Sequence, residues 1–183
     1  MNTYVVFLRG VNVGGNMILK MDLLKKALLA NQYEDIQTYI NSGNILLRSM
    51  DDKHQLQNNM NHIIETRFGF SVGMIIKTRS ELDEIVVKDP FDPVKEADNA
   101  KRAVLMLSEK INDARASAFV CEVKPEENYY LKGDLLYIYY HHGGGKSKFT
   151  NNYIEKKLKV ISTARNWNTI LKMTDMIRLS TVN

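Results

Sequence analysis

The feature that most limits how this sequence can fold is an order of predicted elements that occurs twice. Each half reads strand, helix, strand, strand, helix, strand, and a further helix follows. In the first half, β-branched and aromatic stretches predict strands at 3–9, 35–40, 44–48 and 72–77, with amphipathic helices at 21–31 and 56–68. In the second half, the strands are predicted at 101–107, 127–133, 135–140 and 159–163, with helices that begin at Ser108 and Thr150. The sequence therefore predicts an α+β protein of two tandem ferredoxin-like (βαββαβ) subdomains, each an open antiparallel sheet with helices on one face.

A helix and a linker are expected between the two halves. Thr78 and Glu81 have the spacing of a capping box, and the helix that they begin ends near Pro90. The stretch that follows, FDPVKEADNA, contains a proline and three acidic residues, as is typical of a linker. The predicted organisation is a first subdomain at 1–78, a connecting helix and linker at 79–99, and a second subdomain with the C-terminal helix at 100–183.

The charge is distributed unevenly. The net charge is +4, yet residues 141–183 hold 8 Lys and Arg against 2 Asp and Glu, while residues 1–140 hold 17 against 19. This C-terminal surplus favours an anionic partner, although a solvated basic helix face would produce the same pattern.

The sequence also limits the compartment. Cys121 is the single cysteine, which excludes a disulfide framework, and its apolar neighbours predict that it is buried. The longest apolar run, residues 135–140, is too short to cross a bilayer, and the N-terminus lacks the pattern of a secretory signal. We expect a soluble cytoplasmic protein without a membrane partner, and no pattern predicts an oligomeric state.

Two long polar loops distinguish the halves from each other. RGVNVGGN at 9–16 follows the first strand, where the second half has a much shorter connection. The second half instead inserts HHGGGKSKF at 141–149 before its second helix. In a βαββαβ sheet the first loop shares an edge with the NSGN turn at 41–44, and the loop at 143–148 shares an edge with the end of the last strand at 163–167.

These two loop clusters are the candidate ligand sites. Glycines let successive backbone N–H groups face an anion, and arginine, lysine and asparagine supply further donors. The first cluster contains Arg9, Gly10, Asn12, Gly14, Gly15, Asn41, Ser42 and Asn44. The second contains Gly144, Gly145, Lys146, Ser147, Lys148, Arg165 and Asn166. The alternative is two irregular loops whose glycines satisfy turn geometry and whose cations pair with carboxylates or solvent.

Several kinds of chemistry find no support in the sequence. GGGKS is not a Walker A motif, because the first glycine of that motif would stand at Tyr140. His141 and His142 are adjacent, so on a strand they face opposite sides, and we expect no metal site and no cofactor. No Ser/His/Asp or Cys/His spacing suggests a nucleophile.

Tyrosines on the last hairpin bear on nucleic-acid binding. Tyr137 and Tyr139 share one face of a strand, with Tyr129 or Tyr130 across the hairpin. Such a face either stacks bases, as in RNA-recognition modules, or covers the sheet against the other subdomain; no RNP1 pattern is present.

Three blocks of the chain resemble a known family. RGVNVGGN, TYINSGNILL and TARNWNTILK are similar to the RGINVGG, TYIQSGNV and TRNWNT blocks of an uncharacterised bacterial family, a domain of unknown function. The resemblance runs from Tyr4 to about Lys172 and implies a small soluble bacterial protein with two similar α+β subdomains and no established activity. Matching positions are Arg9, Gly10, Asn12, Gly14, Gly15, Ser42, Gly43, Asn44, Arg165, Asn166 and Trp167. Relatives often carry arginines after the double glycine, whereas residues 16–19 are neutral here.

Three functions remain open at this point. The first is a binding module for an anionic ligand, either a nucleic acid or a phosphorylated metabolite. The second is an enzyme acting on a small phosphorylated substrate, with Arg9, Lys146 and Arg165 stabilising charge but with no evident general base. The third is a protein-interaction module that uses the tyrosine face.

Overall fold

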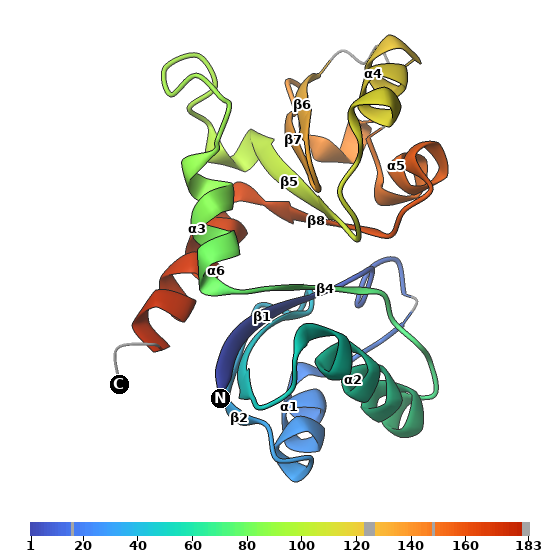
Figure 1. The fold of residues 1–183 in the computed structure, drawn as a ribbon, viewed down its shortest axis with the longest axis vertical. Helices are drawn as coiled ribbons and strands as arrows, with labels where there is room; N and C mark the ends of the chain where they lie inside the picture. The colour runs from blue at the N-terminus through green and yellow to red at the C-terminus, as the bar shows by residue number, and fades with distance from the viewer. Residues whose placement is uncertain (16, 123–126, 148, 181–183) are drawn as a thin grey trace. The chain divides into compact units, whose positions relative to one another are not determined.

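A computed structural model describes residues 1–15, 17–122, 127–147 and 149–180, with the side chains of Glu122 and Lys146 left out. Its elements follow the predicted order (Figure 1). In the first half these are β1 (Asn2–Leu8), α1 (Met21–Ala30), β2 (Glu34–Tyr39), β3 (Asn44–Ser49), α2 (Lys53–Phe68), β4 (Met74–Lys77) and α3 (Arg79–Val87). In the second half they are β5 (Arg102–Leu107), α4 (Asp113–Glu122), β6 (Asn128–Lys132), β7 (Leu135–Tyr139), α5 (Asn151–Leu158), β8 (Ser162–Asn166) and α6 (Trp167–Ser180). Two 3-10 turns, Asn99–Lys101 and Gly144–Lys146, complete the order.

The chain divides into two compact units. Unit 1 comprises Met1–Asp83 with the C-terminal segment from Lys172, and unit 2 comprises Glu84–Leu171. The division falls within α3 and within α6. The organisation predicted from the sequence, with boundaries at residues 78 and 99, stays a prediction.

The sheet of unit 1 has the order β2-β3-β1-β4, and its paired strands run antiparallel. Alternate residues of β1, namely Tyr4, Val6 and Leu8, belong to the core that α1 and α2 share with one face of this sheet. In α1 the buried positions are Met21, Leu24 and Leu28, which recur at the spacing of one helical face, so the predicted amphipathic helix is present. The same antiparallel four-strand arrangement is found in unit 2, with the order β6-β7-β5-β8. The predicted fold class, α+β with two ferredoxin-like units, is confirmed.

Capping residues explain where α2 begins and ends and where α5 begins. Asp52 caps α2 through a capping box, because its carboxylate accepts the Gln55 N–H at 2.8 Å and the Gln55 side chain accepts the Asp52 N–H at 3.0 Å. Gly69 ends this helix in the left-handed conformation at φ 80°. Thr150 caps α5, as predicted, by accepting the Tyr153 N–H at 3.2 Å.

Three local predictions in unit 2 are wrong. Helix α4 begins at Asp113 instead of next to Ser108, because Asn112 supplies the cap and accepts the Arg115 N–H at 2.9 Å. Phe119 packs into the core of unit 2, and Cys121, two residues further along the helix and therefore on nearly the opposite side, is exposed, although its apolar neighbours predicted burial. The last strand spans 162–166 instead of 159–163, because Ser162 to Asn166 form the ladder with β5.

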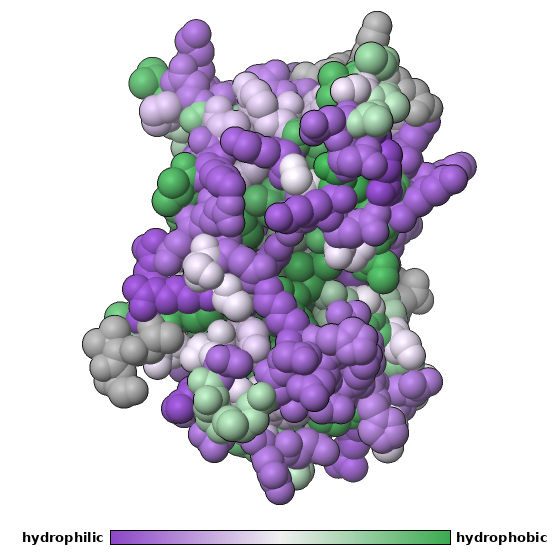
Figure 2. All heavy atoms as spheres, in the orientation of Figure 1, coloured by the Kyte–Doolittle hydropathy of each residue, from purple (hydrophilic) through white to green (hydrophobic). Residues whose placement is uncertain are grey.

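Hydrophilic side chains cover most of the face shown in Figure 2, and the hydrophobic areas on that face are small and separated. Among the residues that the structure describes, no helix is long and apolar enough to cross a membrane.

Candidate functional site

The end of β1 is the place where the predicted loops of unit 1 meet. The Leu8 N–H donates to the Gly43 carbonyl at 2.8 Å, and the Arg9 N–H donates to the Gly73 carbonyl at 2.7 Å. These two bonds tie the loop at 9–20 to the turn at 40–43 and to the strand entry at Gly73. The predicted neighbourhood of RGVNVGG and NSGN is therefore confirmed.

Asn12 holds the β1–α1 loop in its shape. Its backbone is left-handed at φ 57°, and its side-chain Nδ2 donates to the carbonyls of Leu19 at 2.8 Å and Asn41 at 2.6 Å. Its Oδ1 accepts the Leu19 N–H at 2.8 Å. The amide of Asn12 thus closes the loop onto the start of α1 and onto the β2–β3 turn, which occupies both of its N–H groups.

The β2–β3 turn is held by its own side chains. Asn44 is fully buried, and its Nδ2 donates to the Tyr39 carbonyl at 3.0 Å and the Ser42 Oγ at 3.1 Å. Gly43 has φ 74°, and a Cβ built on it would lie 2.7 Å from both Leu8 Cβ and Val11 Cγ2. Only glycine fits this contact, so the SGN block has a packing cause that is independent of any ligand.

A hollow of about 700 Å³ opens beside these loops. It is lined by Asn12, Leu19, Lys20, Met21, Asp22, Leu23, Thr38, Ile40 and Asn41. Asn12 and Asn41 belong to the predicted set, whereas Arg9 is not part of this lining. The hollow therefore collects the β1–α1 loop, the first turn of α1 and the end of β2 around one space.

The charged groups of the hollow, Lys20 and Asp22, were not among the predicted site residues. Lys20 is the N-cap residue of α1, with no hydrogen bond from its side chain to the helix, and Asp22 lies in the first turn. The N-terminus of a helix carries a partial positive charge that attracts anions, which Lys20 reinforces and Asp22 opposes. The position of Lys20, one residue before the predicted helix start, was the signal that could have identified it.

The β1–α1 loop contains three glycines, of which Gly14 and Gly15 are exposed. Gly10, Gly14 and Gly15 all have positive φ, at 68°, 64° and 78°. A Cβ on Gly14 or Gly15 would meet no atom within 4 Å, so these two glycines are needed for their backbone angles instead of for close packing.

In unit 2, the second predicted cluster is only partly assembled. Tyr139 pairs with Arg102, and Asn166 pairs with Ala103, so β7 and β8 both end at the edge where β5 begins. The expected shared edge is confirmed, with the entry of β5 between the two exits. Gly144 and Gly145 are exposed, and Gly144 packs on Tyr140, since an added Cβ would lie 3.3 Å from the ring.

The remaining members of that cluster have local partners or lie outside the described residues. Ser147 Oγ accepts the Phe149 N–H at 3.0 Å, just before α5 begins. Asn166 Nδ2 donates to the Asn99 and Ala100 carbonyls at 3.3 and 3.2 Å, and its Oδ1 accepts the Asn168 N–H. Lys148 and the side chain of Lys146 are outside the described part of the chain.

Arg165 is a strand residue and not a loop residue, because β8 extends to Asn166. Only 7% of its surface is exposed, and its guanidinium donates to the Thr163 Oγ1 and the Ala164 carbonyl, both at 2.8 Å. Burial lowers the pKa of Arg165 to about 10. The guanidinium is thus a buried charge within the sheet.

Two tyrosines of the predicted face in unit 2, Tyr137 and Tyr139, are covered. The Tyr137 hydroxyl donates to the Ile85 carbonyl at 3.0 Å, and its ring packs against Trp167. Tyr139 packs against Phe91, as does Tyr130. Tyr137 and Tyr139 are 1% and 7% exposed, so their rings cannot stack bases without prior opening.

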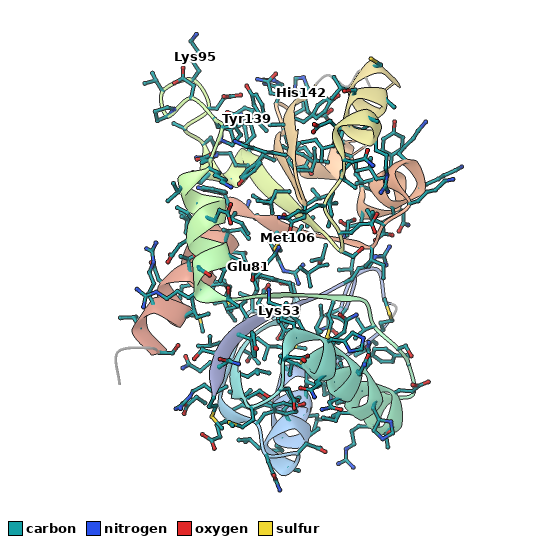
Figure 3. The ribbon with its side chains drawn as sticks, in the orientation of Figure 1. Lys53, Glu81, Lys95, Met106, Tyr139 and His142 are labelled. Carbon is teal, nitrogen blue, oxygen red and sulfur yellow. The ribbon has the colours of Figure 1, made fainter. Side chains whose placement is uncertain are left out.

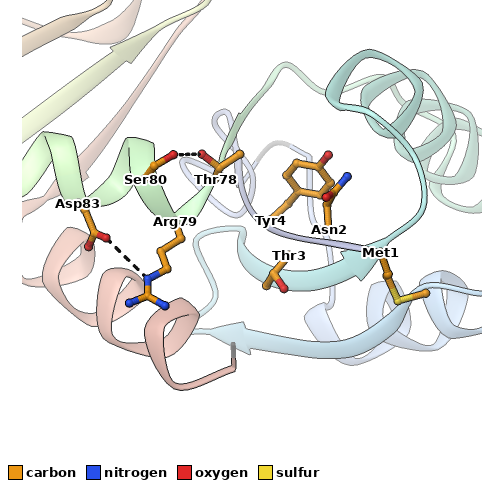
Figure 4. A pocket seen from close by; sticks show the side chains of 8 residues that line it. All are labelled: Met1, Asn2, Thr3, Tyr4, Thr78, Arg79, Ser80 and Asp83. Carbon is orange, nitrogen blue, oxygen red and sulfur yellow. Dashed lines mark hydrogen bonds and ion pairs between the residues drawn. The ribbon is translucent and has the colours of Figure 1, made fainter. Parts of the chain in front are cut away.

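A second hollow, of about 590 Å³, lies at the opposite edge of the sheet of unit 1 (Figure 4). Thr78 Oγ1 and Ser80 Oγ are 3.1 Å apart in its wall, and Arg79 faces Asp83 at 3.7 Å. Close to this edge, Lys53 and Glu81 point at each other and form an ion pair (Figure 3). Because the charges here are internally paired, this hollow is a weaker candidate for a charged ligand.

A metal centre is equally unsupported. Among the described residues, no group of three or more His, Cys, Asp and Glu side chains could hold a metal ion. The site that the geometry favours is therefore the hollow between the β1–α1 loop, α1 and the β2–β3 turn.

Comparison with known proteins agrees with the fold. The chain is similar to a solved structure, conserved bacterial protein SP0830 from Streptococcus pneumoniae, with a TM-score of 0.74 and 23% identity over 96% of this chain and 98% of that one. No curated protein matches the chain. Residues 1–137 match the family described as Protein of unknown function (DUF1697). Because this match spans well over half of the sequence, and because the three motif blocks had indicated a bacterial family of this kind, the protein belongs to the DUF1697 family.

Proposed function

We propose that the chain binds a small anionic ligand, of the class of phosphorylated metabolites, in the hollow at the end of β1. The observation that carries the proposal is a hollow of about 700 Å³. It is enclosed by the β1–α1 loop, which Asn12 holds in place, by the first turn of α1 and by the end of β2. Lys20, the Thr38 hydroxyl and the helix N-terminus supply the donors that an anion needs.

Two charged side chains of the hollow should have opposite effects on the affinity for an anion. Lys20 attracts an anion, while Asp22 repels it from the same lining. Lys20→Ala should weaken binding about threefold to tenfold, and Asp22→Asn should strengthen it about twofold to fivefold. Lys25→Ala is the matched control, because Lys25 is exposed on the same helix outside the lining.

Isothermal titration with inorganic phosphate, pyrophosphate, ribose 5-phosphate and a nucleoside monophosphate tests the proposal. We expect saturable binding of at least one of these probes, with opposite responses of the two variants and none in the control. The absence of binding for all four, or an equal affinity of wild type and Lys20→Ala, would contradict it.

A nucleic acid is the other anionic partner that the sequence left open. The covered rings of Tyr137 and Tyr139 favour the small ligand over it. A single-stranded RNA probe in the same titration separates the two, because affinity for nucleic acid falls steeply with salt concentration as counterions are released.

The enzymatic alternative has one structural argument in its favour. Asp22 places a carboxylate, a group that the two loops lack, in the wall of the same hollow as Lys20. If the chain turns over a phosphorylated substrate, Asp22→Asn should bind that substrate and fail to release phosphate. Phosphate release that persists in this variant would exclude Asp22 as the base.

A further inference from the structure

The strongest unassigned feature of the molecule is the outer edge of the sheet in unit 2. Strand β6 stands at the end of the order β6-β7-β5-β8, so among the described residues it pairs with β7 alone. The outer side of such a strand presents backbone N–H and C=O groups to any extended chain that approaches.

The hairpin geometry indicates which groups these are. Lys132 and Leu135 pair across the two-residue turn at Gly133 and Asp134. The pair next to such a turn exchanges both hydrogen bonds, so every second residue of β6 directs its backbone groups outwards. Leu131 is such a residue, and it lines the groove described next.

A groove of about 710 Å³ follows this edge. Its lining comes from the end of α3, from α4 and from the hairpin: Val87, Lys88, Asp89, Pro90, Val120, Tyr129, Tyr130, Leu131, Lys132 and Tyr137. Three large apolar side chains are conspicuously exposed in it, Val87 at 81%, Val120 at 51% and Tyr130 at 46%. Exposed apolar side chains that gather along one groove mark a binding surface, whereas isolated ones do not.

The charge of the groove is positive once its ion pairs are taken into account. Asp89 is paired with the buried Arg102, and Lys88 is paired with Glu84. Lys132 is exposed, and no ion pair of the described residues involves it. An occupant with a carboxylate near Lys132 would complement this charge.

We propose that the β6 edge binds an extended peptide segment of a partner protein, which adds a strand to the sheet of unit 2. In this segment apolar side chains alternate with threonine, so the apolar ones lie against Val120 on the face of the sheet that carries Leu131, and the threonine methyl groups lie against Val87 and Tyr130 on the other face. An acidic residue in step with the threonines lies on that second face, opposite Lys132. Main-chain hydrogen bonds to β6 provide the affinity, and the apolar positions provide the selectivity.

The test uses a fluorescein-labelled peptide, Glu-Val-Thr-Val-Thr-Val-Glu, and the full-length protein. The control peptide has proline at the central valine, which removes a backbone N–H and cannot extend a ladder. We expect a saturable rise in fluorescence anisotropy with the first peptide, and at least about tenfold weaker binding of the second.

Three protein variants locate the binding on this edge. Val87→Asp and Val120→Asp place a carboxylate in the apolar lining and should each weaken binding at least about tenfold. Val94→Asp is the matched control, since Val94 is 83% exposed in the same unit and outside the groove, and its affinity should equal that of wild type. Circular dichroism of each variant verifies that it is folded.

Hydrogen exchange reports on the backbone directly. The bound peptide should slow exchange of the Leu131 amide, while amides in unit 1 stay unchanged. Equal binding of the two peptides, no saturation at all, or unchanged Leu131 exchange would overturn the proposal. Sedimentation that shows wild-type dimers dispersed by Val87→Asp would also overturn it, because the edge would then belong to a second copy of the chain.

Discussion

Each unit forms an equivalent pair of backbone hydrogen bonds at the end of its first strand, but the chain beyond that strand differs between the two units. In unit 1, Leu8 donates to Gly43 and Arg9 to Gly73; in unit 2, Leu107 donates to Asp134 and Ser108 to Ile161. After these bonds, unit 1 runs through the loop at 9–20, whereas unit 2 reaches α4 through 108–112. A repeated scaffold thus fixes the edge, and in unit 1 the inserted loop borders a hollow there.

The last strands of the two units match in the same way. Val5 pairs with Lys77 in unit 1, and Val104 pairs with Arg165 in unit 2, so the two cations occupy equivalent positions. Both are buried, at 6% and 7% exposure. The equivalence implies that Arg165 belongs to the scaffold of the repeat, which explains a basic residue in the TARNW block without reference to a ligand.

The largest expected difference between the units concerns their hairpin glycines. Gly43→Ala combines a left-handed backbone with contacts of 2.7 Å to Leu8 and Val11, whereas Gly133 has a similar φ of 62° with no atom near. We expect Gly43→Ala to lower the free energy of unfolding by about 3 kcal/mol and Gly133→Ala by about 1 kcal/mol.

Urea denaturation followed by far-UV circular dichroism measures both glycine variants. Equal losses would mean that the turn at 40–43 relaxes around the new methyl group, and the argument that packing selects Gly43 would then fail.

A second comparison concerns how each loop is fastened. Asn12→Ala removes three hydrogen bonds from the loop of unit 1, while Ser108→Ala removes one, from the Ile161 N–H at 3.1 Å. The expected losses of stability are about 2 and about 0.7 kcal/mol. Asn41→Ala is the control, because Asn41 accepts through its backbone carbonyl, and it should change stability by less than about 0.5 kcal/mol.

Faster exchange of the Leu19 amide in Asn12→Ala would locate that effect in the loop. A variant that loses no stability and keeps Leu19 protected would show that the loop holds its shape without Asn12.

A third comparison concerns the caps of α2 and α5, which follow the third strand of each unit. Asp52 takes part in a reciprocal capping box, whereas Thr150 accepts a single bond. Asp52→Ala should cost about 1.5 kcal/mol and Thr150→Ala about 1 kcal/mol. Thermal denaturation of the two variants checks this order, and a greater loss for Thr150→Ala would contradict it.

Many of the features compared here could be predicted from the sequence, because the periodicity of buried residues and the capping of helices depend on neighbouring residues in the chain. The stripes of α1 and α2, the Thr78 and Thr150 caps and the meeting of RGVNVGG with NSGN followed from period and topology. The start of α4 and the end of β8 did not, since Asn112 and Ser108 are both good caps and since ladder pairing with β5 decides how far β8 extends. Lys20 and Asp22 were missed as site residues because the sequence pattern there indicates only that a helix begins. The hollow beside that helix is apparent only in the folded chain.

The smallest expected difference concerns stability in acid, and it arises at the third residue of the helix that follows the last strand of each unit. Glu81 in α3 corresponds to Thr169 in α6, so unit 1 alone has a titrating group there. Burial opposes ionisation of Glu81, but hydrogen bonds from Lys53 and the Thr78 backbone outweigh it and lower its pKa below the ordinary 4.5. A lowered pKa stabilises the folded state at pH values above 4.5, and this stabilisation is lost as the pH falls through the folded value.

Because the Glu81 side chain is 36% exposed, solvent screening should hold its contribution below about 1 kcal/mol. Denaturation midpoints of wild type, Glu81→Gln and Lys53→Met between pH 7 and about pH 3 measure it. Both variants should lie below wild type at pH 7 and converge with it in acid, since protonation removes from wild type what the substitutions have already removed. A constant offset across the pH range would instead mean that packing of these side chains, and not the charge of Glu81, distinguishes unit 1 from unit 2 at this position.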